Sequence, residues 1–245
     1  MLRNEILLVL GVSLGMSALY SLLVIIDLQT RPVPLSSQVT AMNTSQAPGR
    51  PWLDLAYQLR GALGLVIPAL LALHLLRRDR PFAIADIGLD WRRRPWFDIG
   101  TGALLAAVIG VPGIGLYLVA HSLGFNTAIS ASSLPDSWWG VPILVLKAAG
   151  NAFLEEVVVV AYLMTRLGDL RWRPWAIIAA SALLRGSYHL YQGWGGFVGN
   201  AIMGVVFAYF YTRTKRVMPL IIAHTLLDIG AFVGYRYLAG PLGLP

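Results

Sequence analysis

The chain has 245 residues, of which 57% are hydrophobic and only 13% are charged. Soluble domains carry about 25% charged residues, so this composition indicates a membrane protein. The absence of cysteine excludes disulfides, thiolate metal sites and cysteine nucleophiles. The net charge of +7 does not indicate a nucleic-acid partner, because the basic residues cluster in short segments between apolar runs and no nucleic-acid-binding motif occurs.

Apolar segments recur along the chain, and a membrane-spanning helix needs about 20 residues. These segments predict an all-α fold, a polytopic membrane helix bundle of about seven transmembrane helices. Residues 1–140 are expected to contain the first three helices and an irregular external loop over residues 27–54, and residues 141–245 the last four helices. The predicted spans are Ile6–Ile26, Leu55–Leu76, Phe97–His121, Val141–Leu163, Pro174–Tyr191, Gly195–Tyr211 and Val217–Tyr237.

The distribution of basic residues indicates the orientation of the bundle. Of the 19 lysines and arginines, 13 lie at one set of predicted helix ends and three at the other. The positive-inside rule therefore predicts a cytoplasmic N-terminus and an external C-terminus. The first segment lacks a small-residue cleavage site, so we expect an uncleaved anchor rather than a signal peptide. The expected location is a prokaryotic plasma membrane, with several spans in contact with membrane lipid.

Polar residues interrupt four consecutive predicted spans. An ionisable group at membrane depth costs at least about 2.5–3.5 kcal/mol, so it marks a candidate functional site. Two of the three glutamates of the chain, Glu155 and Glu156, lie side by side in the fourth span. The following spans carry His189 in the fifth, Asn200 in the sixth, and His224 with Asp228 in the seventh.

Helical spacing groups the polar residues of the fourth and fifth spans. Asn151 and Glu155 are four residues apart and share one face, whereas Glu156 is turned away by about 100°. Arg185 and His189 are also four residues apart. Two basic groups on one helix complement two carboxylates on the preceding helix, so we expect the two helices to be neighbours. The alternative interpretation is a purely structural ion pair.

The last two spans offer further polar groups. His224 and Asp228 are four residues apart, so the carboxylate can orient the imidazole ring, although the two could also form a self-contained local pair. Asn200 lies in a glycine-rich span and could reach the polar site or simply join two helices. No zinc-protease motif, serine-hydrolase elbow or P-loop occurs, so any chemistry must be assembled across helices.

The order and spacing of these groups resemble the CPBP family of intramembrane proteases, which includes type II CAAX prenyl endopeptidases and bacteriocin-processing or immunity proteins. The resemblance covers about Leu144–Val233. The family motifs are Glu-Glu-x-x-x-Arg, Phe-x-x-x-His and His-x-x-x-Asn or Asp. They match this sequence at Glu155, Glu156, His189, His224 and Asp228.

Two motif positions depart from the family pattern. Val160 stands at the arginine position of the first motif, and Arg185 stands at the phenylalanine position of the second. The chain has therefore lost a cation on one helix and gained one on the next. We expect Arg185 to compensate Glu156 from across the helix pair, and Val160→Arg to restore a protein that carries Arg185→Ala.

The resemblance implies an intramembrane endopeptidase that cleaves a peptide or lipidated protein near its C-terminus. Glu155 with His189 would activate water, and His224 with Asp228 would polarise the scissile carbonyl. Glu156 would be the fifth catalytic residue. Glu155, His189 and His224 could also hold a catalytic zinc, and we favour this metallopeptidase-type site, with a metal-free glutamate–histidine pair as the alternative.

Two other functions are compatible with the sequence. A non-catalytic member of the family could keep the fold as a membrane scaffold or accessory subunit, and the departures at Val160 and Arg185 support this alternative. A proton-coupled transporter could also use acidic and histidine residues inside the membrane. The sequence predicts neither the substrate nor a protein partner.

Overall fold

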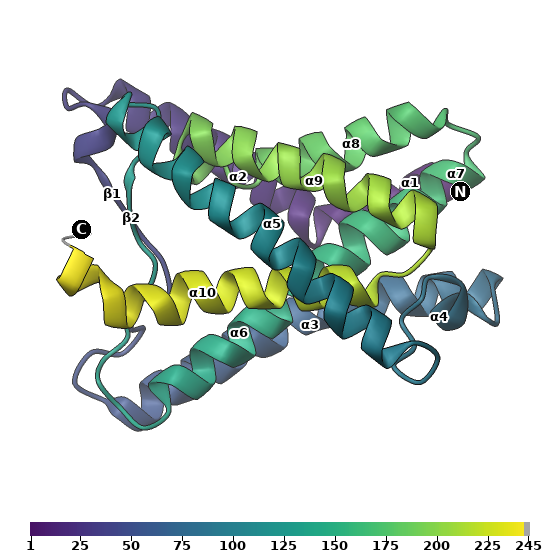
Figure 1. The fold of residues 1–245 in the computed structure, drawn as a ribbon, viewed down its shortest axis with the longest axis horizontal. Coiled ribbons are helices and arrows are strands. Elements are labelled where there is room, and N and C mark those ends of the chain that lie inside the picture. Colours follow the sequence, from purple (N-terminus) through teal and green to yellow (C-terminus); the bar gives the residue numbers. More distant parts are fainter. Residues whose placement is uncertain (243–245) are drawn as a thin grey trace.

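The computed structural model describes residues 1–242 and is mostly helical, with its long helices running between two ends of the molecule (Figure 1). Besides the α-helices it contains two short strands, two 3₁₀ turns and one π-helix. The α-helices are α1 (Leu2–Gly11), α2 (Leu14–Thr30), α3 (Pro51–Asp79), α4 (Ala83–Asp86), α5 (Pro95–Ser122), α6 (Gly140–Glu155), α7 (Leu163–Asp169), α8 (Pro174–Ser187), α9 (Trp194–Thr214) and α10 (Met218–Leu242). The remaining elements are η1 (Leu35–Ser37), β1 (Val39–Ala41), β2 (Ala128–Ser130), η2 (Glu156–Tyr162) and η3 (Leu190–Gln192).

The described residues contain four helices that are long and apolar enough to cross a membrane, namely α3, α5, α9 and α10. The pair α1 and α2, bent by 54°, makes up to a fifth candidate span. The predicted spans Val141–Leu163 and Pro174–Tyr191 fall on shorter helices, because α6 has 16 residues before the π-helix begins and α8 has 14. Length and composition thus support four to five spans where the sequence pattern predicted seven.

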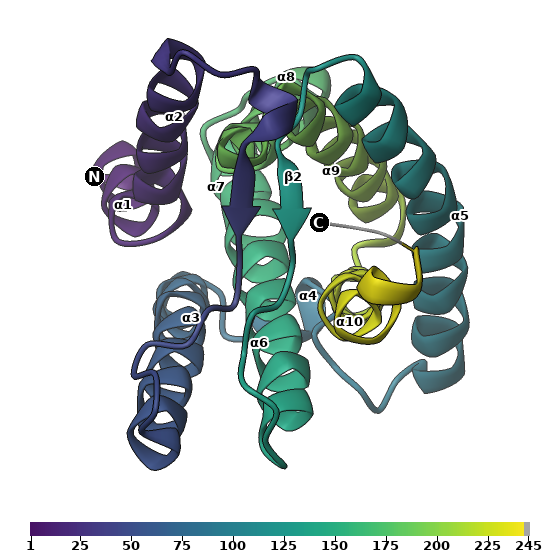
Figure 2. The same ribbon diagram turned by 90° about the vertical axis from the view of Figure 1, so that its left-hand side faces the viewer.

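Two short strands join the loops at one end of the molecule. β1 pairs with β2 in parallel, with Val39 opposite Ala128. Figure 2 shows this ribbon in front of the central helices. The hydroxyl of Thr40 donates to the carbonyl oxygen of Tyr191 at 3.1 Å, which fixes the ribbon to η3. The loop over residues 27–54 is therefore partly ordered, and the purely helical prediction missed a pairing between segments far apart in the sequence.

The centre of the bundle is the continuous helical stretch formed by α6, η2 and α7. It packs against α3 and α10, while α8 packs against α9 and α10 against α5. The four consecutive valines Val157–Val160 are all fully buried. Gly204 of α9 lies so close to α8 that an added Cβ would come within 2.8 Å of the Cα of Ala182. This glycine lets α8 and α9 approach one another next to Arg185.

A buried ion-pair network fixes α1 to the rest of the bundle. Arg166 of α7 is only 2% exposed and bonds Glu5 of α1 at 2.9 Å and Asp79 of α3 at 2.9 Å. Glu5 also accepts hydrogen bonds from Tyr162 at 3.0 Å and from Arg78 at 3.1 Å. Glu5, the third glutamate of the chain, is therefore a structural residue that connects three helices.

Candidate active site

The two adjacent glutamates lie where the backbone changes from an α-helix to a π-helix. Glu155 is the last residue of α6, and Glu156 is the first residue of η2. Both side chains are buried, with Glu155 3% and Glu156 0% exposed. Single turns of π-helix are frequent at functional sites, because the wider turn changes the direction of the side chains beside it. The π-helix therefore helps to aim two adjacent carboxylates at one group.

That group is Arg185 of α8, which is fully buried between the two carboxylates. Its Nη1 atom donates to Oε2 of Glu155 at 3.3 Å, and its Nη2 atom donates to Oε1 of Glu156 at 2.7 Å. The guanidinium also lies over the ring of Phe207, 5.3 Å from the ring centroid. The expected pairing of Arg185 with Glu156 is thus present, and Arg185 contacts Glu155 as well.

His224 of α10 completes the buried cluster. Its Nδ1 atom lies 2.7 Å from Oε1 of Glu156, and because a carboxylate accepts, Nδ1 donates. Its Nε2 atom lies 3.6 Å from Asp228, which is longer than a hydrogen bond. Glu156, rather than Asp228, therefore orients the imidazole ring. Asp228 accepts a hydrogen bond from Asn151 at 3.0 Å, so Asn151 of α6 joins the site at its edge.

His189 lies beside this cluster and is partly exposed. Its Nδ1 atom is 3.0 Å from the carbonyl oxygen of Arg185, which can only accept, so Nδ1 carries the proton and Nε2 keeps its lone pair. The neighbouring Tyr188 donates its hydroxyl to Oε2 of Glu155 at 2.6 Å. Its ring centroid lies 4.8 Å from that of His189. Tyr188 therefore connects the His189 segment to Glu155.

Tyr188 and Phe207 were not predicted as site residues. Asn200, in contrast, was predicted as a supporting residue of the site. The Asn200 amide donates to the carbonyl oxygen of Gly196 in its own helix, and within the described residues it makes no hydrogen bond to the cluster. The position of Tyr188 next to His189 was a usable signal, since a tyrosine hydroxyl inside a membrane protein needs a polar partner. Phe207 gave no comparable signal, because its role depends on the packing of α9 against α8.

Buried charges of opposite sign dominate the electrostatics of the cluster. Burying a charge is costly unless it is paired, and here one guanidinium faces two carboxylates. Two polar atoms in this part of the described chain are buried without a hydrogen-bond partner, Oε2 of Glu156 and Nε of Arg185. Such atoms are uncommon in folded proteins, so each leaves hydrogen-bonding capacity free inside the cluster.

The cluster meets only part of the requirement for a metal ion. Glu155, Glu156 and His224 offer ligand atoms that all lie within 4.8 Å of one another, so by donor type and spacing they could hold a metal. This group contains Glu156 in place of His189, which the sequence had suggested as a ligand. Arg185 already donates to both carboxylates, and its positive charge would repel a divalent ion. As arranged, the residues do not fit a metal bound alongside Arg185.

The fold and site define a helical membrane protein with a buried glutamate–arginine–histidine cluster at the meeting point of α6, η2, α8 and α10. Residues 137–230 match the family described as type II CAAX prenyl endopeptidase Rce1-like, and this range contains every residue of the cluster. The chain therefore carries an Rce1-like type II CAAX prenyl endopeptidase (CPBP) family domain. Comparison with curated proteins and with solved structures gave no match.

Proposed function

We propose that the chain is an intramembrane endopeptidase that hydrolyses a peptide bond near the C-terminus of a peptide or lipidated protein. The observation that carries this proposal is the buried cluster of Glu155, Glu156 and His224 inside the family-matching range. Charged groups buried inside a membrane protein are costly, so their presence in this cluster favours a chemical role.

In the proposed reaction Glu155 removes a proton from water while the water oxygen bonds to the carbonyl carbon of the substrate. His189 supports this step through the lone pair on Nε2, the ring nitrogen that is not hydrogen-bonded to the carbonyl oxygen of Arg185. His224, oriented by Glu156, acts as an imidazolium, a form that the carboxylates of Glu156 and Asp228 beside the ring favour. Its Nε2–H then donates to the developing oxyanion. Transfer of the proton from Glu155 to the amide nitrogen then breaks the C–N bond and releases an amine and a carboxylic acid.

A zinc-dependent reaction is the second form of the same proposal. The spacing of the three ligand atoms supports it, and it requires Arg185 to move away from the carboxylates. A bound zinc would supply a Lewis acid and an activated water at this position. The pairing of Arg185 with both glutamates favours the metal-free form.

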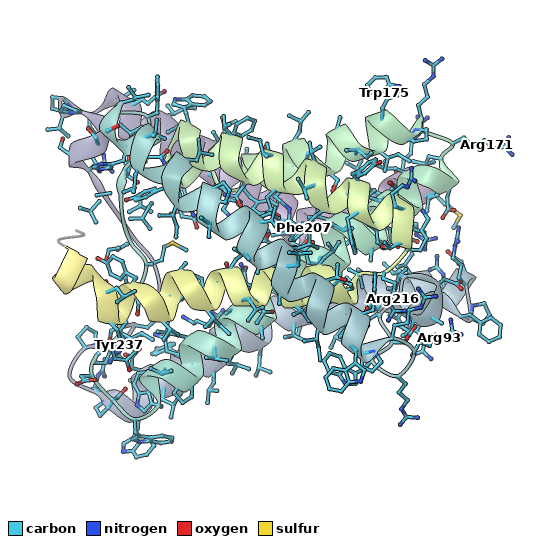
Figure 3. All side chains as sticks on the ribbon, viewed as in Figure 1. Arg93, Arg171, Trp175, Phe207, Arg216 and Tyr237 are labelled. Carbon is cyan, nitrogen blue, oxygen red and sulfur yellow. The ribbon has the colours of Figure 1, made fainter. Side chains whose placement is uncertain are left out.

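The arrangement of charges supports a bundle with its N-terminus on the cytoplasmic side. Arg93, Arg171 and Arg216 gather at one end of the molecule, and Tyr237 lies at the opposite end (Figure 3). Phe207, which packs under Arg185, lies between these ends. We propose that the stretch from α6 to α7 and the stretch from α8 to η3 provide two further crossings, which gives seven with the bent pair as one.

A non-catalytic scaffold is the competing function, and one observation favours it. Both carboxylates are paired with a fully buried guanidinium, which is also how a purely structural ion cluster would look. In a scaffold the cluster would stabilise the packing of α6, η2, α8 and α10 and would not bind substrate.

The deciding experiment is cleavage of a pool of prenylated and unprenylated C-terminal peptides by detergent-purified protein. We expect wild type to cleave at least one member, and Glu155→Gln, His189→Ala and His224→Ala to lower the rate by about 100-fold or more while remaining folded. Asn200→Ala is the matched control, because Asn200 makes its hydrogen bond within its own helix.

A chelator is included in a second arm of the same assay. The metal-free form predicts the same rate with and without chelator, whereas the zinc form predicts a loss that added zinc restores. Wild-type protein that is folded but inert against the whole pool would favour the scaffold.

A further inference from the structure

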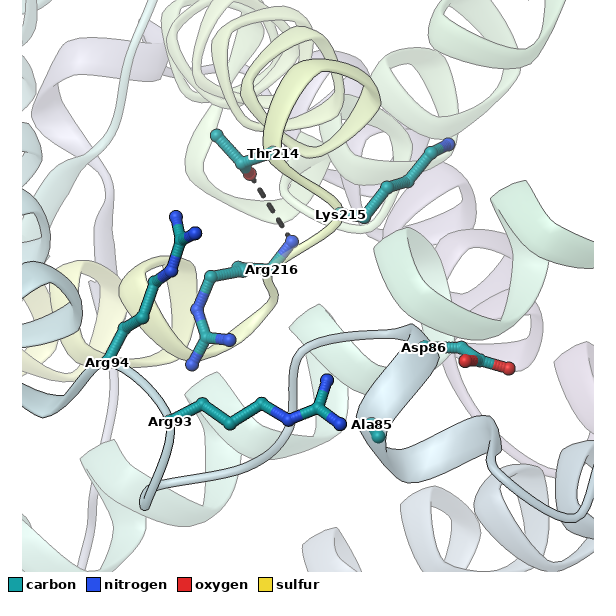
Figure 4. A pocket seen from close by; sticks show the side chains of 7 residues that line it. All are labelled: Ala85, Asp86, Arg93, Arg94, Thr214, Lys215 and Arg216. Atoms are coloured by element: carbon teal, nitrogen blue, oxygen red, sulfur yellow. Dashed lines mark hydrogen bonds between the residues drawn. The ribbon is translucent and has the colours of Figure 1, made fainter.

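A second candidate site lies at the basic end of the molecule, remote from the glutamate cluster. A cavity of about 270 Å³ opens among α4, the segment before α5 and the linker between α9 and α10. Four of its seven lining residues are basic and one is acidic; they are Ala85, Asp86, Arg93, Arg94, Thr214, Lys215 and Arg216. Figure 4 shows the guanidinium groups of Arg93, Arg94 and Arg216 on one side and the carboxylate of Asp86 pointing away from them.

Backbone contacts fix two of the segments that line the cavity. Gly88, at φ +63°, lies so close to the linker that an added Cβ would come within 2.4 Å of the Cα of Arg216. The amide of Val217 donates to the carbonyl oxygen of Ile87 at 2.9 Å. These contacts join the segment after α4 to the linker, and they hold the walls of the cavity together.

The basic residues around the cavity differ in whether their charges are already paired. Arg216 bonds Asp98 at 2.6 and 2.8 Å, and these hydrogen bonds raise the pKa of Arg216 above its usual range, so this wall is permanently charged. Arg93 and Arg94 are exposed, and their guanidinium groups make no ion pair with the described part of the chain. The cavity thus offers two free guanidinium groups to an anion. The ammonium group of Lys215 points away from them and lies over the ring of Tyr211, 5.5 Å from the ring centroid (Figure 4).

A larger and more apolar cavity adjoins the basic one. Its volume is about 600 Å³, and it shares Asp86 and Lys215 with the first cavity. Its apolar lining comes from several helix ends and includes Leu76, Ala83, Ile87, Met164, Ile177 and Tyr211. An anion-binding cavity beside an apolar one suits an amphiphile that carries a phosphate next to a hydrocarbon chain.

We propose that the basic cavity binds a phosphate group, either of an anionic phospholipid or of free phosphate. The adjoining apolar cavity favours the phospholipid. Indole side chains flank the same segment at Trp91 and Trp96, both exposed, and tryptophan prefers the headgroup level of a bilayer. The site is independent of the proposed protease reaction, since it uses none of the residues of the glutamate cluster.

The test measures the thermal unfolding midpoint of detergent-purified protein during three separate titrations. The probes are inorganic phosphate against sodium chloride of equal ionic strength, phosphatidylglycerol in the micelle, and diacylglycerol as the phosphate-free lipid. We expect phosphatidylglycerol to raise the midpoint more than diacylglycerol. A response to inorganic phosphate with no added effect of the lipid would identify free phosphate as the source.

Variants separate a built site from general surface charge. Arg93→Gln combined with Arg94→Gln is expected to weaken binding of the active probe about tenfold or more, and Lys215→Gln is expected to weaken it less. Arg77→Gln combined with Arg173→Gln removes the same charge from exposed residues outside the cavity and is expected to leave binding unchanged. The proposal is overturned if both double variants respond alike, or if neither probe raises the midpoint of wild type.

Discussion

Arg185 is the cation that pairs with both glutamates of the polar cluster. It is fully buried and donates to one oxygen of each glutamate, and its neighbours allow this because Gly204 leaves room and Phe207 offers an aromatic face. At the first-motif position where the family has arginine, this chain has Val160, which is itself completely buried. The cation that pairs with Glu156 therefore lies on the facing helix α8 rather than on the glutamate helix.

Removal of the guanidinium is expected to destabilise the protein strongly. Arg185→Met keeps most of the volume of the side chain but removes the guanidinium that both buried carboxylates share, at a cost of about 3–5 kcal/mol. Adding Glu156→Gln removes one of these charges and is expected to recover at least half of the loss, measured as the thermal unfolding midpoint in detergent. If Arg185→Met alone unfolded at the wild-type midpoint, Arg185 would not be the residue that neutralises the two carboxylates.

Tyr188 is predicted to contribute to the rate of cleavage as well as to stability. Its hydroxyl donates to Glu155 at 2.6 Å, and a hydrogen bond to a charged group contributes about 1.5–3 kcal/mol. Tyr188→Phe is therefore expected to lower kcat for peptide cleavage about tenfold or more while the fold survives. Tyr191→Phe is the matched control, because the Tyr191 hydroxyl contacts Gln192 and Met42 rather than a site carboxylate. Equal rates for the two variants would exclude this role.

The sequence allowed some residue contacts to be predicted and not others. Charge complementarity and four-residue spacing predicted that Arg185 meets Glu156, because few groups in a membrane protein can pair with a buried carboxylate. The partner that orients His224 was assigned by spacing to Asp228, and in the structure His224 donates the orienting hydrogen bond to Glu156 on another helix. Contacts across helices depend on packing angles, which side-chain spacing within one helix does not determine.

At the scale of elements, length and hydrophobicity located the helices but not their internal geometry. The predicted spans at Leu55–Leu76 and Phe97–His121 lie within α3 and α5. The change to a π-helix at Glu156 was not predicted, because its sequence of four valines and small or aromatic residues fits an ordinary α-helix equally well. The β1–β2 ribbon was missed because each strand has only three residues and its partner is distant in the chain.

The docking of α1 is predicted to depend on Glu5. Glu5→Ala removes an acceptor from the nearly buried Arg166 and from Tyr162, so we expect a loss of about 1–3 kcal/mol of stability and faster hydrogen exchange in α1. Asp27→Ala is the control, since Asp27 forms an exposed ion pair with Arg31 that should contribute little. If α1 exchanged at the wild-type rate in Glu5→Ala, the network would not be what holds it.

At the scale of the whole molecule, the two ends differ in charge and in structure. The basic end carries the loops around α4 and the linker before α10, and the opposite end carries the β1–β2 ribbon (Figures 1 and 3). Since short basic loops remain on the cytoplasmic side, the whole fold is expected to insert with the ribbon outside. The phosphate-binding cavity proposed above would then face the cytoplasmic leaflet.

Single-cysteine labelling tests this orientation directly, because the chain contains no cysteine of its own. Ser37→Cys places a thiol on an exposed turn beside the ribbon, and Gly168→Cys places one at the basic end, where an added Cβ meets nothing within 4 Å. In intact cells a membrane-impermeant maleimide is expected to label Ser37→Cys and to label Gly168→Cys only after permeabilisation. The reverse labelling pattern would show the opposite membrane orientation. Labelling of both thiols in intact cells would mean that the two ends do not lie on opposite sides of the membrane.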